Sequence, residues 1–163
     1  MQMEGTLPTK AAAFALVTRP DGAVLCTVEG PADAPRVGLP GGKWEPGADG
    51  PSWARLLARE YAEEVGGALP PARRAGYLEW GGARYRVRFV VLELDEEVAA
   101  AVPVGPSADP RGSVRDVRWL QPGDMPAAGQ LRPHVNAALR VLASSALLAR
   151  EVAQKPPPPG DGL

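Results

Sequence analysis

The chain contains a single cysteine, Cys26. One cysteine cannot form an internal disulfide, so a disulfide-stapled fold is excluded, and the sequence fits a reducing, cytoplasmic compartment. Cys26 lies in an apolar run that predicts a strand. This setting favours a packing role over a nucleophilic one.

Long hydrophobic runs and an excess of one charge are also missing. No apolar stretch approaches the roughly 20 residues that cross a bilayer. The N-terminus lacks the charged segment and apolar core of a secretory signal. The formal net charge of −1 argues against a general nucleic-acid or membrane surface. We therefore expect neither a membrane nor a nucleic-acid polymer as a partner.

Histidine occurs once, as His134. A Ser-His-Asp relay would have only this base, and the sequence offers no nucleophile and orienting acid to pair with it. His134 falls in a segment that predicts a helix, so we expect a structural role for it.

The 163 residues suit one domain, predicted over 1–154, followed by a Pro-rich disordered tail over 155–163. Alternating or apolar runs predict strands, and Ala-, Leu- and Glu-rich runs predict helices. Strands are predicted at 11–18, 23–29, 75–80, 84–94 and 114–120, a hairpin turn at 19–22, helices at 52–65 and 132–154, and a helical turn at 96–101. This order predicts an α/β fold with a mixed sheet between helices.

The predicted helix at 52–65 carries clustered carboxylates. Glu60, Glu63 and Glu64 fall within an arc of roughly 100° at helical spacing. Mg²⁺ prefers oxygen ligands and binds through a few carboxylates plus substrate phosphates. A solvated acidic face is the alternative. Gly41 and Gly42, just before this helix, would let the backbone approach a ligand, which favours a cradle for a metal-bound diphosphate.

The stretch from Gly42 to Gly67 resembles the motif of the Nudix (MutT-like) hydrolases. That motif is G-x5-E-x7-R-E-U-x-E-E-x-G-U, with U a bulky apolar residue. The matching positions, at the family's spacing in the closing half, are Gly42, Arg59, Glu60, Glu63, Glu64 and Gly66, with Tyr61 at the first U.

The match has two departures before the helix. Sixteen residues separate Gly42 from Arg59, where the family has thirteen, which places an insertion around Ala48-Asp49-Gly50. The family's first glutamate, which supports the loop, is absent, and Asp49 is the candidate to replace it. The last U position is Gly67, which is also atypical.

The resemblance implies an α/β/α sandwich and divalent-metal-dependent hydrolysis of a nucleoside diphosphate-linked (NDP-X) substrate. The metal, Mg²⁺ or alternatively Mn²⁺, would bind Glu60, Glu63, Glu64 and the Gly41-Gly42 turn, with Gly42 as the candidate backbone ligand. Glu63, Glu64 and Arg59 form the candidate catalytic set, in which Arg59 orients the glutamates by ion pairing. The general base would be one of the three glutamates or an acid from a later loop: Asp95, Glu96 or Asp109.

The strand predicted at 84–94 places Tyr85, Val87, Phe89 and Val91 on one face, as a half-buried strand requires. Arg84, Arg86 and Arg88 share the other face, which is either solvated or contacts substrate phosphates. These arginines join Gly41, Gly42 and Trp44 as candidate substrate-binding residues. Trp44 would either stack on a base or fix the loop, and Tyr85 is expected to be a core residue.

Two other functions remain open. One is a nucleotide-binding or regulatory domain that has the Nudix fold but is catalytically weak or inactive. The other is an isoprenoid diphosphate isomerase, for which Cys26 alone is a poor basis. The sequence leaves the exact substrate and the oligomeric state open, with a homodimer as one alternative.

Overall fold

The computed structural model describes residues 10–82, 84–107 and 112–140. Its strands are β1 Lys10–Thr18, β2 Val24–Glu29, β3 Arg36–Gly38, β4 Gly41–Lys43, β5 Arg74–Gly81, β6 Tyr85–Glu93, β7 Gly105–Pro106 and β8 Val114–Leu120. The helices are α1 Pro46–Asp49, α2 Trp53–Glu64 and α3 Glu96–Ala100, with 3-10 turns at Pro122–Asp124 and Ala128–Gln130. Residues 133–140 are also helical.

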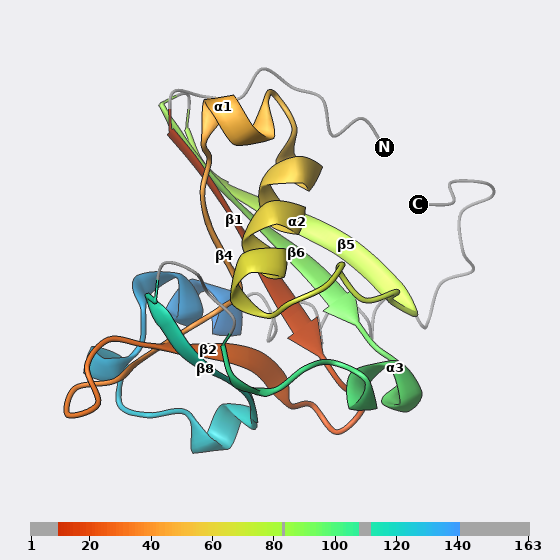
Figure 1. The fold of residues 1–163 in the computed structure, drawn as a ribbon, viewed down its shortest axis with the longest axis vertical. Helices are drawn as coiled ribbons and strands as arrows, with labels where there is room; N and C mark the ends of the chain where they lie inside the picture. Colours follow the sequence, from red (N-terminus) through yellow and green to blue (C-terminus); the bar gives the residue numbers. More distant parts are fainter. Residues whose placement is uncertain (1–9, 83, 108–111, 141–163) are drawn as a thin grey trace.

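The strands form one mixed sheet in the order β5-β6-β1-β2-β8-β7, with β3 added to β2 and β4 to β1. The central β1 runs parallel to β6 and antiparallel to β4. The β1 and β2 strands pair only at Thr18 and Val24, beside the turn that joins them. They diverge from there, so β2 and β8 cross the direction of β1, β5 and β6 (Figure 1).

Helix α2 covers one face of β1 and β6. The side chain of Ser52 accepts a hydrogen bond from the Arg55 N–H (3.2 Å) and caps the N-terminus of the helix. The apolar stripe Leu57, Tyr61 and Val65 is buried against alternate alanines of β1. Small residues on β1 let the helix approach the sheet closely, which fixes α2 relative to its neighbouring strands.

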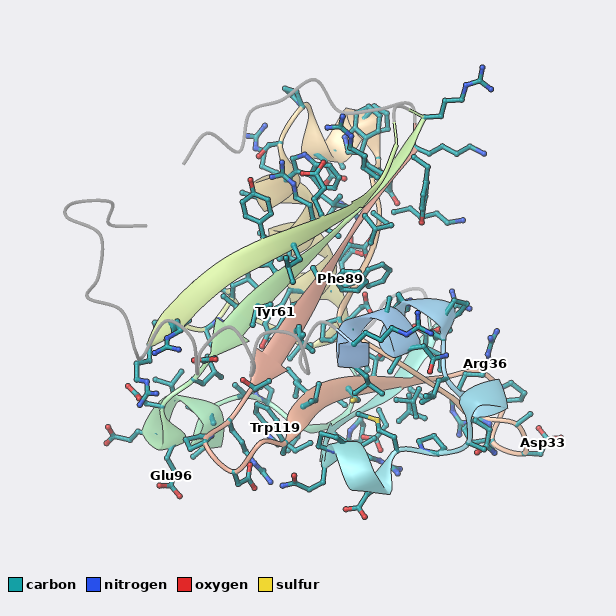
Figure 2. All side chains as sticks on the ribbon, turned by 180° about the vertical axis from the view of Figure 1, so that it is seen from behind. Asp33, Arg36, Tyr61, Phe89, Glu96 and Trp119 are labelled. Atoms are coloured by element: carbon teal, nitrogen blue, oxygen red, sulfur yellow. The ribbon has the colours of Figure 1, made fainter. Side chains whose placement is uncertain are left out.

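The opposite face carries a second apolar cluster under residues 133–140. Phe89 of β6 packs there with Leu16, Val135 and Cys26, whereas Tyr61 of α2 belongs to the first cluster (Figure 2). Cys26 is fully buried, and burial raises the pKa of its thiol to about 12. Its position matches the predicted packing role. A buried thiol that stays protonated argues against the isomerase function, which needs a reactive thiol. Helices on both faces of a mixed sheet confirm the predicted α/β/α sandwich.

The predicted strands and the α2 helix are confirmed to within one or two residues, as is the turn at 19–22. The sequence missed β3, β4, β7 and α1, because these short elements lie in Pro- and Gly-rich stretches. The pairing of β3 with β2, of β4 with β1 and of β7 with β8 is a tertiary effect that local propensity does not report. The helix predicted at 132–154 is described over 133–140, and the rest of it, with the 155–163 tail, lies outside the described residues. No described helix has the length and apolar character needed to span a membrane.

Candidate active site

Glu60, Glu63 and Glu64 line one small hollow of about 200 Å³, which we call the carboxylate hollow. The sequence prediction that these three side chains share a face is therefore borne out by their positions on α2. The lining is completed by Glu29, Gly41, Ser113 and Arg132. A fourth carboxylate, from β2, thus faces the helix.

The glycines of β4 press directly against the helix. A Cβ on Gly42 would lie 2.6 Å from Glu60 Cδ, and one on Gly41 would overlap the backbone of Ala13 and Phe14. Gly41 has φ 147°, a backbone conformation that residues with a side chain rarely adopt. Its N–H donates a hydrogen bond to Glu64 Oε1 (3.1 Å). Glycine at both positions is what brings the β4 backbone into contact with the carboxylates.

Glu60 and Glu64 are buried. Burial, which disfavours the charged form, raises the pKa of Glu64 to about 9, and repulsion by Glu60 and Glu29 adds to the effect. Burial also raises the pKa of Glu60, although the Arg59 guanidinium opposes that shift. Carboxylates crowded in this way favour the arrival of a cation.

Arg59 contacts two of the glutamates. Its Nη1 donates to Glu60 Oε1 (3.0 Å) and lies 3.5 Å from Glu63 Oε2. Its Nη2 donates to the carbonyl of Lys43 (3.2 Å), which ties the helix to the end of β4. The pKa of Arg59 is raised, chiefly by its hydrogen bonds with Asp49. These contacts agree with the predicted role of Arg59 in orienting the glutamates.

Asp49 comes from the inserted loop and is fully buried. Arg59 Nε donates to Asp49 Oδ1 (2.7 Å) and Nη2 to Oδ2 (2.9 Å). Asp49 Oδ2 also accepts the Glu45 N–H (2.8 Å). Burial opposes its ionisation, but these hydrogen bonds outweigh burial and lower the pKa of Asp49. Asp49 therefore occupies the loop-supporting position for which the motif has no glutamate.

Trp44 fixes the same loop. Its indole Nε1 donates to the carbonyl of Gly50 (2.7 Å), and the ring packs against the cluster under α2. Neither hollow at the glutamates includes it in its lining. Of the two roles that the sequence left open, the geometry favours the structural one.

The donor set fits a hard divalent cation in its chemistry, because carboxylates line the hollow beside the backbone of Gly41. Within the described ranges, no group of three or more acidic, histidine or cysteine residues stands in an arrangement that could hold a metal ion. The reason is visible in the contacts, because Glu60 is held by Arg59 and Glu64 by Gly41 N–H. Binding an ion would require these side chains to converge.

A second hollow of about 430 Å³ opens beside the first, and we call it the aromatic hollow. The His134 ring stacks on Phe14 with ring centres 3.8 Å apart, and Phe14 in turn stacks on Phe89. Tyr85 lines the same hollow and is 48% exposed. The cations Lys43 and Arg132 stand at its lining, and it shares Glu29, Gly41 and Arg132 with the carboxylate hollow.

Comparison with known proteins identifies the family of this chain. Residues 8–145 match the family model described as the NUDIX domain, which is most of the chain. The chain belongs to the NUDIX domain family. It is accordingly a Nudix hydrolase, the enzyme class that cleaves pyrophosphate bonds.

Solved structures share the fold. A NUDIX hydrolase from Nitrosomonas europaea has a TM-score of 0.59 at 21% identity, covering 85% of this chain and 90% of its own. A MutT NUDIX hydrolase from Burkholderia pseudomallei has a TM-score of 0.55 at 23% identity, with 80% and 95% covered. The C-terminal domain of mouse MUTYH, solved in complex with human PCNA, has a TM-score of 0.54 at 20% identity, with 84% and 89% covered. A search of curated proteins finds no match.

The strand arginines of this Nudix domain point away from both hollows. Arg88 is buried between the rings of Trp53 (4.6 Å) and Tyr77 (4.4 Å). Its Nε donates to Glu79 Oε2 (3.1 Å), and Arg86 pairs with Glu79 Oε1 (3.2 Å). Arg84, on the same face by alternation, is exposed. The face that the sequence predicted to be solvated or substrate-binding is partly core, because α2 packs on it.

The other general-base candidates lie elsewhere. Asp95 pairs at long range with Arg73 (3.9 Å), and Glu96 lines a hollow with Arg19 beside α3. Neither lines the carboxylate hollow. Asp109 lies outside the described residues.

Four residues at the Nudix site escaped the sequence reasoning. Glu29 and Arg132 belong to no motif, and only β2–β3 pairing brings them to the glutamates. Tyr85 and His134 were expected to be structural, yet both line the aromatic hollow. The alternation of β6 gave no signal for Tyr85, because it placed this residue on the apolar face with Val87 and Phe89, yet Tyr85 is 48% exposed.

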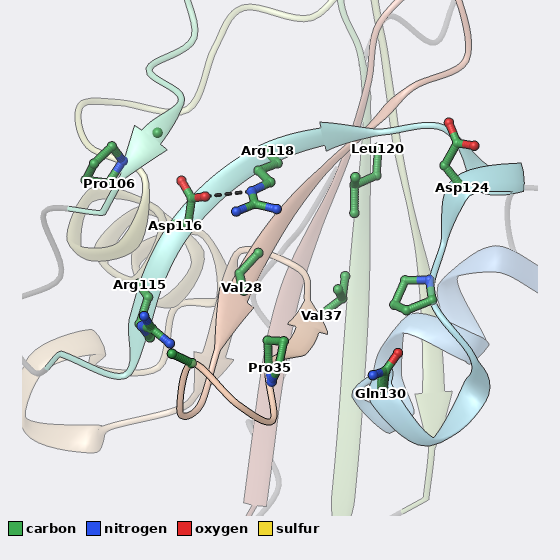
Figure 3. A pocket seen from close by; sticks show the side chains of 13 residues that line it. Val28, Pro35, Val37, Pro106, Arg115, Asp116, Arg118, Leu120, Asp124 and Gln130 are labelled. Carbon is green, nitrogen blue, oxygen red and sulfur yellow. Dashed lines mark hydrogen bonds and ion pairs between the residues drawn. The ribbon is translucent and has the colours of Figure 1, made fainter.

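A larger hollow of about 700 Å³ lies between β2, β3 and β8 (Figure 3). Its lining mixes apolar residues such as Val28 and Pro35 with the ion pair Arg118–Asp116 (2.6 Å). No Nudix motif residue lines it, so size alone does not identify the site.

Proposed function

We propose that this Nudix protein hydrolyses the diphosphate bond of a nucleoside diphosphate derivative with the help of a divalent cation, Mg²⁺ or Mn²⁺. The observation that carries the proposal is the junction of the two hollows. Carboxylates and the β4 glycines lie on one side of it and stacked aromatic rings on the other.

Glu60, Glu63, Glu64 and the carbonyl of Gly42 would hold the cation. A divalent ion bound there supplies charge neutralisation for the diphosphate. Gly41 and Gly42 bring the backbone close enough to take part, since a larger residue would displace Glu60.

One carboxylate of the set accepts a proton from the attacking water. The water oxygen forms a bond to one phosphorus as the bridging phosphorus–oxygen bond breaks, and the bridging oxygen leaves with the second phosphate. Glu63 is the candidate, because it is the one of the three glutamates that is not buried, and Arg59 lies from it only at ion-pair distance (3.5 Å). Arg59 does not touch the substrate in this scheme but orients Glu60 and Glu63.

The aromatic hollow would receive the nucleoside. Its volume of about 430 Å³ and its lining of Phe14, Phe89 and Tyr85 suit a planar ring system. Arg84, Arg86, Arg88 and Trp44 have no part in this scheme, because they face away from the hollows or fix the loop.

The test is formation of a nucleoside monophosphate, measured by chromatography, from nucleoside triphosphates, nucleotide sugars, dinucleoside polyphosphates and NAD-type dinucleotides, with Mg²⁺ or Mn²⁺. Glu63→Gln and Glu64→Gln keep side-chain size and remove charge, and we expect each to lower turnover about a hundredfold or more. Glu97→Gln, an exposed residue on α3, is the matched control and should leave turnover unchanged.

A catalytically weak or regulatory nucleotide-binding domain is the second candidate. The glutamates, as they stand among the described residues, form no ready metal site, and the motif lacks its first glutamate. Tight nucleotide binding without turnover on any compound of the panel would replace the hydrolase proposal with this one.

A further inference from the structure

Arg132 stands at the junction of the two hollows. It lines both of them, and among the residues that line the carboxylate hollow it is the only cation. The other charged residues of that lining are Glu29, Glu60, Glu63 and Glu64. An anionic substrate that spans the two hollows would lie beside this guanidinium.

The backbone of Arg132 is held in place. Its N–H donates to the carbonyl of Val37 (2.8 Å), and the preceding Leu131 forms a parallel bridge with Val37. A Cβ on Gly38 would lie 3.4 Å from Arg132 Cγ, so the side chain runs along the glycine of β3. The start of the helix at 133 is thereby fixed against the sheet.

The guanidinium retains unused donor capacity. Arg132 Nε is buried and makes no hydrogen bond, and it lies 3.5 Å from Glu29 Oε2, an ion pair without hydrogen-bond geometry. The side chain as a whole is 41% exposed, so a ligand can reach it. A buried donor without an acceptor is unfavourable, so the guanidinium would gain by turning towards a phosphate oxygen bound beside its exposed part.

We propose that Arg132 binds a phosphate group of the substrate where the substrate crosses from the aromatic hollow to the carboxylate hollow, with Glu29 as its positioning partner. This inference rests on the proposed function. Arginine matches phosphate oxygens through paired N–H donors, which a lysine cannot reproduce. The role predicted for the β6 arginines thus passes to an arginine from the C-terminal part of the chain.

The test uses the full-length protein and two probes. Methylenediphosphonate with Mg²⁺, measured by calorimetry, presents a diphosphate whose bridge cannot be hydrolysed. Mn²⁺ titration measures the carboxylates alone. The variants are Arg132→Gln and Arg132→Lys, and Arg86→Gln is the matched control because it removes an exposed arginine from the opposite face.

The two probes should respond in opposite directions. We expect Arg132→Gln to weaken methylenediphosphonate binding about tenfold or more and to raise KM for the best panel substrate similarly. Mn²⁺ should bind the variant at least as tightly as the wild type, because a positive charge beside the glutamates has gone. Arg132→Lys should recover part of the phosphate affinity, and Arg86→Gln should leave both affinities unchanged.

Three results would count against the idea in distinguishable ways. Probe affinity and KM within about twofold of wild type in Arg132→Gln, a difference of under about 0.5 kcal/mol, would overturn the role of Arg132 and leave the hydrolase intact. Loss of Mn²⁺ binding together with probe binding would mean that Arg132 serves the fold of the site, which also overturns the proposal. A wild-type protein that neither binds the probe nor turns over the panel would sink the proposed function itself.

Discussion

Arg59 donates two hydrogen bonds to Asp49, Nε to Oδ1 at 2.7 Å and Nη2 to Oδ2 at 2.9 Å. The two residues are separated by the inserted loop and the first turns of α2, and the pair closes that loop onto the helix. Arg59 remains able to contact Glu60 and Glu63 from the same guanidinium. The loop before α2 is longer than in the family motif, and its Asp49 pairs with Arg59 in place of the motif's first glutamate.

Replacing Asp49 should destabilise the fold. Asp49→Ala leaves the largely buried Arg59 without its main partner, and breaking such a pair costs about 3 kcal/mol. Urea denaturation measures the loss of unfolding free energy. Asp33→Ala, which removes an exposed aspartate, should cost under about 0.5 kcal/mol. An equal, small effect in both variants would show that the pair does not support the loop.

A methyl group on Gly42 should damage the site more than the fold. Gly42→Ala places Cβ 2.6 Å from Glu60 Cδ, so the carboxylate must move. We expect Mn²⁺ affinity to fall about tenfold, while unfolding free energy falls by about 1–3 kcal/mol from overpacking.

The matched control for this change is Gly47→Ala. Nothing lies within 4 Å of a Cβ at Gly47, which sits in α1. Its Mn²⁺ affinity and stability should equal or exceed those of the wild type. Wild-type metal affinity in Gly42→Ala would contradict the proposed contact between β4 and the carboxylates.

Arg88 should matter for stability and not for substrate affinity. Arg88→Gln loses two ring contacts and the ion pair with Glu79, which together stabilise the packing of α2 on β6 by about 1–3 kcal/mol. Thermal denaturation should show the loss, and KM for the best substrate should stay unchanged. A raised KM with intact stability would return Arg88 to the substrate-binding set.

The site divides into a part that local sequence reports and a part that it does not. Spacing on one helix placed Glu60, Glu63 and Glu64 together, and the predicted bounds of 52–65 lie one residue outside those of α2 at each end. Both predictions concern one continuous segment, in which helical periodicity alone decides which side chains share a face.

The other residues of the site are brought together by pairing between segments that lie far apart in the sequence. Glu29 reaches the hollow because β3 aligns on β2, and Arg132 because Leu131 bridges to Val37. The burial of Arg88 likewise depends on Trp53 arriving from another element. A single sequence carries no periodic signal for such long-range contacts, so it predicted a solvated or substrate-binding face for the strand arginines and gave no sign that Arg88 is buried.

Stability should depend on pH through His134. Its Nε2 accepts the Leu39 N–H (3.1 Å), and burial, with a contribution from Arg132, lowers the pKa to about 3. In the unfolded chain the imidazole titrates near 6.5. Between these values the unfolded state binds the proton and the folded state does not. The histidine's contribution is therefore full above about pH 6.5 and is lost as the pH falls towards 3.

From pH 7 to pH 5.5 this amounts to about 1 kcal/mol of unfolding free energy. Glu64 acts in the opposite direction, because its raised pKa makes the folded state lose stability as the pH increases. The comparison therefore needs His134→Phe, which retains a ring against Phe14 but cannot titrate. Urea denaturation at both pH values should show the wild type losing about 1 kcal/mol more than the variant on acidification. Equal pH dependence in the two proteins would mean that folding does not lower the pKa of His134, and its acceptor role towards Leu39 would then be wrong.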